Sequence, residues 1–426
     1  MTQYCPICDL MASRLRQDES NIMEEKEEKF DIAVVGGGPA GLSAAYAAAM
    51  GGAKVILFEK DESIAHSIRT SGVTWISEME RLGIPSKFYN PIHNYRFISP
   101  SNDVLITGDI SKSCVLDIRS TYQHLAFLAA KEGVQIMVKS NVIDVIKDGH
   151  RIAGVKANTP QGKLTVRSTL VIDASGFSTS VGRKARVVGQ WTRYGVGAEY
   201  ECYCEGIDST TWVLMVGQKY SDAGYAWLFP LSPNRVRIGV GISRPESKVE
   251  PLEKLHKIIE KRFKPLDAVR DGRIQPIELH YGFIPNEGVR RNSIVDGMIM
   301  VGDSAGQSNP LVLEGIRYAI EFGRLAGKVG ADSLSQNSNR ESLLEYERSW
   351  KAKVESKIKS ALKVQMRWLG LTDEQWDKEI EILRDMTVYE FLDFIKADFS
   401  ASNMMKLALH HPKMAARQLF SMILRS

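Results

Sequence analysis

Six residues in the N-terminal part of the chain have types and spacing that suit the binding of phosphate groups. They read Gly36-Gly37-Gly38-Pro39-Ala40-Gly41 and fit the pattern GxGxxG. In this pattern the first glycine permits a tight turn, the second lets the backbone approach a pyrophosphate, and the third lets a helix pack closely on a strand. The helix that follows directs free N–H groups and a partial positive charge at the phosphates. The spacing therefore predicts a dinucleotide-binding loop.

The segments around this loop have the pattern of a strand, a helix and a second strand. Residues 30–35 are mainly apolar, residues 42–50 are rich in alanine, and residues 54–59 form a second apolar run. That run ends at Glu59, 18 residues after Gly41, where a carboxylate can bind the ribose hydroxyls of an adenosine. The alternative is a glycine-rich turn that binds no ligand.

A second segment, residues 298–306, reads Met-Ile-Met-Val-Gly-Asp-Ser-Ala-Gly and predicts a strand followed by a turn of small residues. It resembles the second FAD segment of the glutathione-reductase and p-hydroxybenzoate-hydroxylase superfamily. The resemblance implies that Asp303 binds a ribityl hydroxyl, and that the turn, Gly315 and Ile316 lie along the flavin ring. A helix that starts there can stabilise negative charge on the reduced flavin. Asp303 can also cap that helix, and the two roles are compatible.

The same superfamily has a small-residue turn near the cofactor where this chain has Asp173-Ala174-Ser175-Gly176. It also has an arginine that reaches the FAD, at a place that corresponds to Arg119; a surface ion pair is the alternative for this residue. The residues that we expect to contact FAD are Gly36, Gly38, Pro39, Ala40, Gly41, Glu59, Lys60, Arg119, Val142, Ala174, Gly176, Gly302, Asp303, Gly306, Gly315 and Ile316.

An aromatic segment narrows the expected substrate. Residues 225–230 read Tyr-Ala-Trp-Leu-Phe-Pro, and after eight residues Gly239-Val240-Gly241 follows. This order matches the pattern YxWxFP-x(7–8)-GxG and resembles the geranylgeranyl reductase family, whose members saturate double bonds of prenyl chains. The resemblance implies catalytic and substrate contacts by Tyr225 and Trp227, with further substrate contacts by Phe229, Pro230, Gly239 and Gly241.

The three rings of this segment alternate, so on a strand Tyr225, Trp227 and Phe229 project to one face. Such a stripe forms either the core of a sheet or the aromatic wall of a cavity beside the flavin. Aromatic faces can stabilise positive charge on a tertiary carbon during alkene reduction.

One segment departs from the family pattern. Many members have Cys-Gly in a loop that faces the flavin, where this chain has Ser71-Gly72. Both residues are retained as catalytic candidates at this position. The proton donor stays unassigned, because a serine stands where the resemblance implies a thiol.

These segments predict an α/β (α+β) fold with three parts. A two-part, Rossmann-like FAD-binding domain is expected at residues 30–90, 115–184 and 290–335. An antiparallel β-sheet domain for the substrate is expected at 91–114 and 185–289, and a helical region at 336–426. Residues 1–29 are polar and are expected to be a flexible extension. Within these parts we expect a strand pair at 164–173 and a single strand at 294–301.

Composition excludes several other classes of protein. The net charge of +4, from 55 basic and 51 acidic residues, is too small to indicate nucleic-acid binding. Five cysteines make no disulfide framework and favour a reducing cytoplasm. Cys5 and Cys8 form one CxxC without a second pair, so no metal site is expected, although a joint site or redox pair with Cys202 and Cys204 is the alternative. No signal peptide or membrane span is visible.

The expected partners are a prenyl lipid or prenyl diphosphate and an external electron donor, either NADPH or reduced ferredoxin. Residues 403–426 mix apolar with basic residues and predict a helical cap on the core or a peripheral contact with the inner face of the cell membrane. The main alternative function is a flavin monooxygenase or halogenase of the same superfamily. A non-catalytic, FAD-binding redox protein is the other.

Overall fold

The computed structural model describes residues 26–263, 266, 273–397, 405 and 408–412. Its larger sheet has eight strands, in the order β17-β18-β11-β1-β2-β8, with β10 and β9 added beside β11. Strands β11, β1, β2, β8 and β18 pair in parallel, as expected for a Rossmann-like fold. The strands are β1 (Lys26–Val35), β2 (Val55–Phe58), β8 (Gln135–Met137), β9 (Asn141–Asp148), β10 (Arg151–Thr159), β11 (Gly162–Asp173), β17 (Ile294–Val295) and β18 (Met298–Met300).

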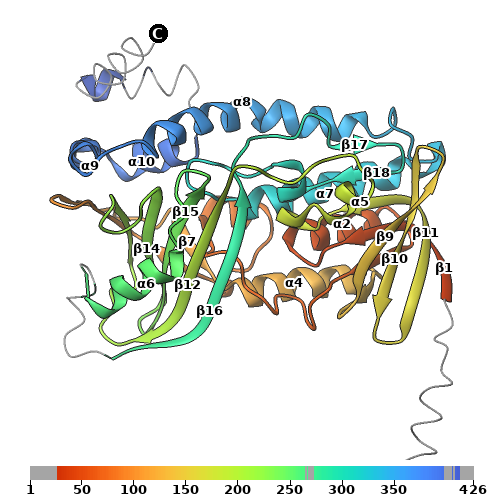
Figure 1. Ribbon diagram of the computed structural model, residues 1–426, viewed down its shortest axis with the longest axis horizontal. Coiled ribbons are helices and arrows are strands. Elements are labelled where there is room, and N and C mark those ends of the chain that lie inside the picture. The colour runs from red at the N-terminus through yellow and green to blue at the C-terminus, as the bar shows by residue number, and fades with distance from the viewer. Residues whose placement is uncertain (1–25, 264–265, 267–272, 398–404, 406–407, 413–426) are drawn as a thin grey trace, which may run out of the picture.

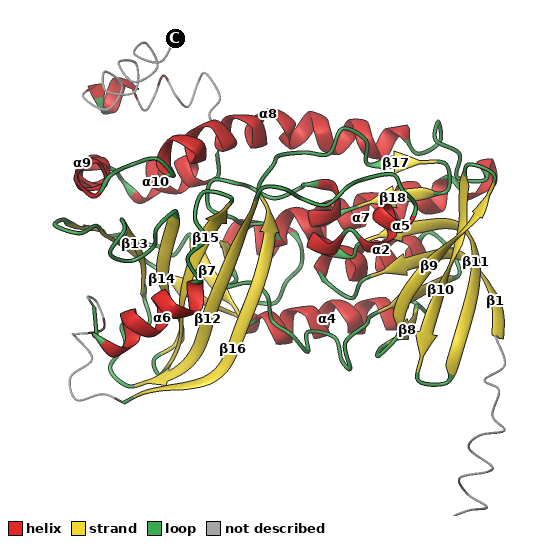
Figure 2. Cartoon of the chain, viewed as in Figure 1, coloured by secondary structure: helices red, strands yellow, loops and turns green. Residues whose placement is uncertain are grey.

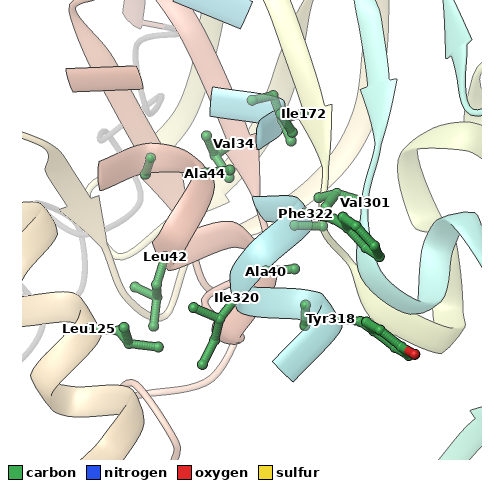
Figure 3. Close-up of a cluster of buried hydrophobic side chains, with 14 of the residues drawn as sticks. Val34, Ala40, Leu42, Ala44, Leu125, Ile172, Val301, Tyr318, Ile320 and Phe322 are labelled. Atoms are coloured by element: carbon green, nitrogen blue, oxygen red, sulfur yellow. The ribbon is translucent and has the colours of Figure 1, made fainter. Parts of the chain in front are cut away.

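Helices α2 (Pro39–Met50), α4 (Ile118–Lys131) and α7 (Ile316–Asp332) pack together beside this sheet (Figure 1). Alanines and glycines allow the close approach of α2 and α7. A Cβ atom added at Gly327 would lie 2.1 Å from the carbonyl oxygen of Ala44, so only glycine fits there. Leu42, Leu125 and Ile320 come from the three helices and meet in the core between them (Figure 3). The alanine-rich run in the sequence is therefore a buried helix.

The second sheet has seven strands in the order β16-β12-β15-β14-β13-β5-β6, and all its neighbours are antiparallel except β13 and β5 (Figure 2). Helix α6 (Pro251–Glu260) packs against β12 and β15. The strands are β5 (Asn94–Ile98), β6 (Asp103–Ile106), β12 (Tyr194–Cys204), β13 (Thr211–Val216), β14 (Gly224–Ser232), β15 (Arg235–Arg244) and β16 (Ile274–Pro285).

A three-stranded sheet of β3 (Val73–Trp75), β7 (Ser113–Leu116) and β4 (Tyr89–Ile92) supplements the two large sheets. The helices near the C-terminal end are α8 (Leu344–Trp368), α9 (Asp373–Glu381) and α10 (Val388–Ile395), and α8 extends along one side of the molecule past both large sheets (Figure 1). Among the described helices, none combines the length and apolar character needed to cross a bilayer. The predicted α/β class and helical C-terminal region are confirmed.

Three local predictions are wrong. Strand β1 begins at Lys26, because residues 26–29 pair with residues 164–167 of β11, and Arg167 forms an ion pair with Glu27. Residues 164–173 lie within one long strand, β11, and not in a strand pair. Residues 294–301 form a short antiparallel hairpin, because Gly297 turns the chain at φ +73°. Cys5, Cys8 and most of residues 403–426 lie outside the described residues.

Candidate functional site

A cavity of about 500 Å³ lies between the two large sheets. One wall comes from the glycine loop, the start of α2 and the turns after β11 and β18. The opposite wall comes from β12, β14, β15 and β16. Its lining includes Gly38, Pro39, Ala40, Glu59, Lys60, Ser71, Tyr122, Ala174, Gly176, Glu199, Tyr225, Trp227, Gly241, His280, Gly302, Asp303, Leu313, Gly315 and Ile316. The structure thus brings together most of the residues that the sequence predicts for the cofactor and substrate.

The three glycines of the loop have different surroundings. A Cβ atom at Gly36, where φ is +116°, would lie 2.3 Å from the carbonyl oxygen of Ala174. A Cβ atom at Gly41 would lie 1.9 Å from the carbonyl oxygen of Gly36. A Cβ atom at Gly38 would meet no described heavy atom within 4 Å apart from its neighbours along the chain, and this residue borders the cavity at the N-terminus of α2. Two glycines therefore allow close packing, and Gly38 leaves open space beside the backbone.

Glu59 is held by backbone N–H groups at the end of β2. Its Oε2 accepts a hydrogen bond from Gly37 N at 2.8 Å, and its Oε1 accepts one from Asp61 N at 2.8 Å. Lys60 also lines the cavity, and its Nζ lies 3.4 Å from Asp61 Oδ1. A hydrogen bond between Gly37 and Glu59 therefore connects the glycine loop directly to the end of β2.

The turn after β18 places Asp303 on the cavity wall. Gly302 has φ +67°, which glycine adopts without strain. Burial raises the pKa of the Asp303 carboxyl to about 7. Burial and the nearby Asp303 also raise the pKa of the Tyr122 phenol, which lines the same cavity. Gly306 lies behind this wall, where a Cβ atom would come 2.3 Å from the carbonyl oxygen of Gly288.

Five of the predicted cofactor contacts do not line the cavity, namely Gly36, Gly41, Gly306, Arg119 and Val142, and the last two lie in other surroundings. Arg119 Nη1 donates to the carbonyl oxygen of Ala65 at 2.6 Å, and Arg119 Nη2 forms an ion pair with Glu278 Oε1 at 2.6 Å. Val142 is 5% exposed and packs in the apolar core beside β9 and β10. The ion pair that the sequence left as the alternative for Arg119 is present.

The aromatic segment on β14 serves both as core and as cavity wall. Tyr225 and Trp227 line the cavity, and the Tyr225 hydroxyl donates to the carbonyl oxygen of Val312 at 2.7 Å. Phe229 is 4% exposed and stacks on Trp227 with ring centroids 6.0 Å apart. Pro230 is buried, and its carbonyl oxygen accepts a hydrogen bond from Asn90 Nδ2 at 2.9 Å.

The GxG part of the motif makes room for Trp227. Gly239 pairs with Trp227 across β14 and β15, and a Cβ atom at Gly239 would lie 2.3 Å from the indole ring. A Cβ atom at Gly241 would lie 3.3 Å from the same ring. The indole therefore lies over β15, and its Nε1 donates to Glu199 Oε2 at 2.6 Å.

Sequence reasoning missed a buried charged group on this wall. Glu199 and His280 are each 3% exposed, and Arg237 is 1% exposed. Arg237 Nη1 donates to the carbonyl oxygen of Ser71 at 2.8 Å, which holds the Ser71-Gly72 loop against the sheet. The signal was available: charged residues stand at inward positions of otherwise apolar or aromatic strands, where an unpaired charge would be costly.

A second, smaller cavity of about 110 Å³ lies between the seven-stranded sheet and the C-terminal helices. Its walls are almost entirely apolar and come from β13, β14, the segment 311–313 and helices α8, α9 and α10. Tyr225 and Leu313 line both cavities and so form the partition between them. The lining includes Phe97, Leu214, Val216, Leu311, Val312, Trp368, Trp376, Ile380, Leu383, Met386, Phe391 and Phe394.

Comparisons with known proteins agree with this geometry. The chain is 30% identical over 389 residues to digeranylgeranylglycerophospholipid reductase 1 of Methanococcoides burtonii, a match that covers 88% of this chain and 93% of the relative. A solved structure from Thermoplasma acidophilum, described as geranylgeranyl bacteriochlorophyll reductase-like, has a TM-score of 0.80 at 26% identity and covers 93% of this chain and 99% of that one. A flavin-dependent brominase, at 18% identity and TM-score 0.66 over 92% of this chain and 99% of its own, shows the fold alone.

The family model described as FAD dependent oxidoreductase matches residues 31–295, more than half of the chain. The predicted cofactor, FAD, and the predicted enzyme class are confirmed. The chain belongs to the FAD-dependent oxidoreductase family, together with the digeranylgeranylglycerophospholipid reductases.

Proposed function

We propose that this enzyme saturates double bonds of geranylgeranyl chains on isoprenoid lipids. The relative from Methanococcoides burtonii is named for that substrate, and the apolar cavity beside the predicted flavin site is the observation that carries the proposal. FAD in its reduced form would supply the hydride, with its electron pair, for such a reaction. The described residues bind the cofactor, hold the chain and exclude water.

The residues that line the larger cavity fit FAD in their chemistry. Gly38 and the N-terminus of α2 would hold the pyrophosphate, since the backbone there is open and directs N–H groups outward. Glu59 would accept hydrogen bonds from the adenosine ribose, and Asp303 would bind a ribityl hydroxyl. The turn that contains Gly315 and Ile316 would border the ring, with the seven-stranded sheet opposite it.

The smaller cavity suits a prenyl chain. Its lining side chains are nearly all apolar, and each methylene group removed from water there contributes about 0.8 kcal/mol. Tyr225 and Leu313 line both cavities, so a chain lodged among the C-terminal helices would enter the flavin cavity beside the Tyr225 ring once these two side chains move apart. The face of Trp227 stands next to it and can stabilise positive charge on a tertiary carbon.

The test is an anaerobic single-turnover experiment. The flavin is reduced with dithionite, excess reductant is removed, and a glycerophospholipid with geranylgeranyl chains is added in detergent micelles. We expect flavin oxidation and a lipid that has gained two hydrogens for each flavin oxidised. The proposal fails if the flavin stays reduced and the lipid mass does not change.

A pair of variants tests the apolar cavity itself. Leu214→Trp fills the cavity from β13, whereas Ile110→Trp adds the same ring at a position that is 59% exposed. We expect Leu214→Trp to slow lipid-dependent flavin oxidation at least tenfold with geranylgeranyl chains, less with a shorter geranyl chain, and Ile110→Trp to match the parent enzyme. Equal rates for the two variants would contradict a chain in this cavity.

The electron donor and the membrane contact are further parts of this proposal. NADPH or reduced ferredoxin would reduce the flavin, and stopped-flow reduction with each donor in turn would identify the physiological donor.

A peripheral contact with the inner face of the cell membrane would give the enzyme access to lipid, and flotation with anionic vesicles would detect this contact.

The rival function is that of a flavin monooxygenase or halogenase, whose fold this chain shares. It predicts oxygen-dependent hydroxylation or halide incorporation in aerobic turnover, without saturation of a prenyl lipid. The apolar lining of the smaller cavity favours the reductase.

A further inference from the structure

Four neighbouring strands of the seven-stranded sheet carry a row of side chains that begins at a buried histidine. In the register of β16, β12, β15 and β14, His280 pairs with Glu199, Glu199 with Gly239, and Gly239 with Trp227. Because Gly239 has no side chain, the Trp227 indole crosses β15 and donates to Glu199 Oε2 at 2.6 Å. The other carboxylate oxygen, Oε1, lies 2.8 Å from His280 Nδ1. The carboxylate is therefore held from both sides.

This row connects the cavity to solvent. Glu199 and His280 both line the cavity, although each is 3% exposed. His280 Nε2 is buried and has no hydrogen-bond partner within the part of the chain that the structure describes. Glu278 Oε2 lies 3.6 Å from that nitrogen, and the Glu278 side chain is 36% exposed. This separation is longer than a hydrogen bond, so a proton reaches His280 from Glu278 only when the two side chains move closer or a water lies between them.

Charged groups on four elements, β12, β15, β16 and α4, surround the pair. Arg237 on β15 has its Nε 3.7 Å from Glu199 Oε1 and its Nη2 3.3 Å from Glu201 Oε2. Arg119 on α4 pairs with Glu278. Burial opposes the ionisation of Glu201, but the hydrogen bond from Arg235 and the charges of Arg237 and Arg235 outweigh it, so the pKa of Glu201 is lowered. The charges of Arg237 and Glu201 thus offset one another beside the Glu199–His280 pair.

In the part of the chain that the structure describes, the Ser71-Gly72 loop offers no thiol, carboxyl or imidazole group at the position where the resemblance implies a thiol. Ser71 stands in the loop where the family resemblance implies a thiol, and an aliphatic hydroxyl is a far weaker acid than a carboxylic acid or an imidazolium. Efficient general acids have a pKa near the operating pH. We propose that Glu199 and His280 form the proton relay for alkene reduction, in which Glu199 is the acid and His280 reloads it. The inference rests on the proposed function.

Protons and electrons are conserved in this reaction. The O–H bond of protonated Glu199 breaks, and a C–H bond forms at one alkene carbon. The other carbon receives a hydride, with its electron pair, from the reduced flavin, so the alkene is reduced and the flavin is oxidised. Glu199 regains a proton from His280 Nδ1 while His280 takes one up at Nε2 from solvent by way of Glu278, which leaves the neutral Nε2–H tautomer. Proton exchange with solvent then restores Nδ1–H before the next turnover. Trp227 Nε1 keeps the carboxylate oriented while the proton moves.

The test uses the FAD-bound enzyme in the anaerobic single-turnover assay. We expect Glu199→Gln and His280→Gln to slow lipid-dependent flavin oxidation by roughly 100-fold or more, the range for loss of a general acid. Glu205→Gln, at an exposed position just beyond β12, is the matched control and is expected to keep the parent rate. FAD content and lipid affinity are measured for each variant and are expected to stay within about threefold. Added imidazole is expected to restore part of the rate in His280→Ala.

A spectroscopic measurement gives a readout that does not depend on turnover. Long-range ¹H–¹⁵N spectra of the ¹⁵N-histidine-labelled, FAD-bound enzyme report which nitrogen of His280 carries a proton. We expect a protonated Nδ1 in the parent, because a carboxylate accepts from it. In Glu199→Gln the amide can donate to Nδ1 instead, and the neutral tautomer with Nε2–H is expected to increase.

Parent rates in both Glu199→Gln and His280→Gln would overturn the relay, as would an unchanged tautomer in Glu199→Gln. A slow rate that follows only from lost lipid affinity or lost FAD would overturn it as well. If the parent enzyme itself fails to transfer hydrogen to the lipid, the proposed function has failed. If the parent succeeds and the variants match it, only the relay has failed.

Discussion

Gly239→Ala tests the claim that the GxG pair exists to accommodate Trp227. A Cβ atom at this position would lie 2.3 Å from Cζ2, 2.4 Å from Cε2 and 2.8 Å from Nε1 of the indole. These contacts are with a rigid ring, packed in turn against Tyr225 and Phe229, so the ring must be displaced. Displacement breaks the 2.6 Å hydrogen bond to Glu199 and leaves that carboxylate without one of its two donors.

The expected cost follows from two contributions. Overpacking of a core costs about 1–3 kcal/mol. A lost hydrogen bond to a charged group costs about 1.5–3 kcal/mol. We therefore expect Gly239→Ala to lower the free energy of unfolding by roughly 3–5 kcal/mol. Urea denaturation of the FAD-bound protein, followed by flavin and tryptophan fluorescence, measures the change.

Gly197→Ala is the matched control, because Gly197 contacts the same indole from β12. There a Cβ atom would lie 3.5 Å from Cη2, an ordinary contact, and we expect a change below about 1 kcal/mol. In the background of Trp227→Phe, the ring is smaller and the Nε1 donor is absent, so the cost of Gly239→Ala should fall by about 2 kcal/mol or more. Equal costs for Gly239→Ala and Gly197→Ala would refute the packing argument.

Three other perturbations have definite expected outcomes. Gly41→Ala places a Cβ atom 1.9 Å from the carbonyl oxygen of Gly36, so we expect loss of FAD binding by equilibrium dialysis, and retention of FAD would contradict the role of the loop. Burial raises the pKa of Asp303 from 3.8 to about 7. Between about pH 4 and 7 the folded apoprotein therefore keeps a proton on this carboxyl that the unfolded chain has lost. The free energy of unfolding should fall over this pH range by on the order of 4 kcal/mol. Urea denaturation of apo Asp303→Asn should lack that pH dependence, and the same slope in both proteins would count against it. Burial raises the pKa of the Cys202 thiol to about 12, so little of the reactive thiolate is present in the native protein. Peptide mass spectrometry should show that iodoacetamide alkylates Cys202 at least 100-fold more slowly in the native protein than in urea. Comparable rates would show that the thiol is accessible.

The sequence was most informative where a function depends on residues that are close together along the chain. Gly36, Gly38 and Gly41 lie in one strand–loop–helix unit, so their spacing alone indicates how the backbone turns and where a phosphate is bound. The alternation of Tyr225, Trp227 and Phe229 indicates a shared face for the same reason, because side chains on a strand repeat every two residues. The turn of the backbone and the shared face of the three rings agree with the structure, and the position of the phosphate stays a prediction.

Sequence reasoning was weaker where a contact depends on how distant segments meet. The charges at residues 26–29 suggested a flexible extension, but pairing with β11 and the ion pair of Glu27 with Arg167 extend the strand. Arg119 was expected at the cofactor, yet it pairs with Glu278, a residue on a strand of the other sheet. The local pattern around residues 26–29 does not indicate that they pair with β11, and the pattern around Arg119 does not indicate Glu278.

By itself the sequence determined the cofactor class and the position of the cofactor loop, since local backbone geometry is encoded in short motifs. Only the tertiary structure decided which side chains of the other sheet line the larger cavity. Glu199, Trp227, Gly239 and His280 come from four strands, and the register of those strands sets the hydrogen bonds that join Trp227, Glu199 and His280. The apolar cavity has the same origin, because the sheet and the C-terminal helices form it only when they pack together.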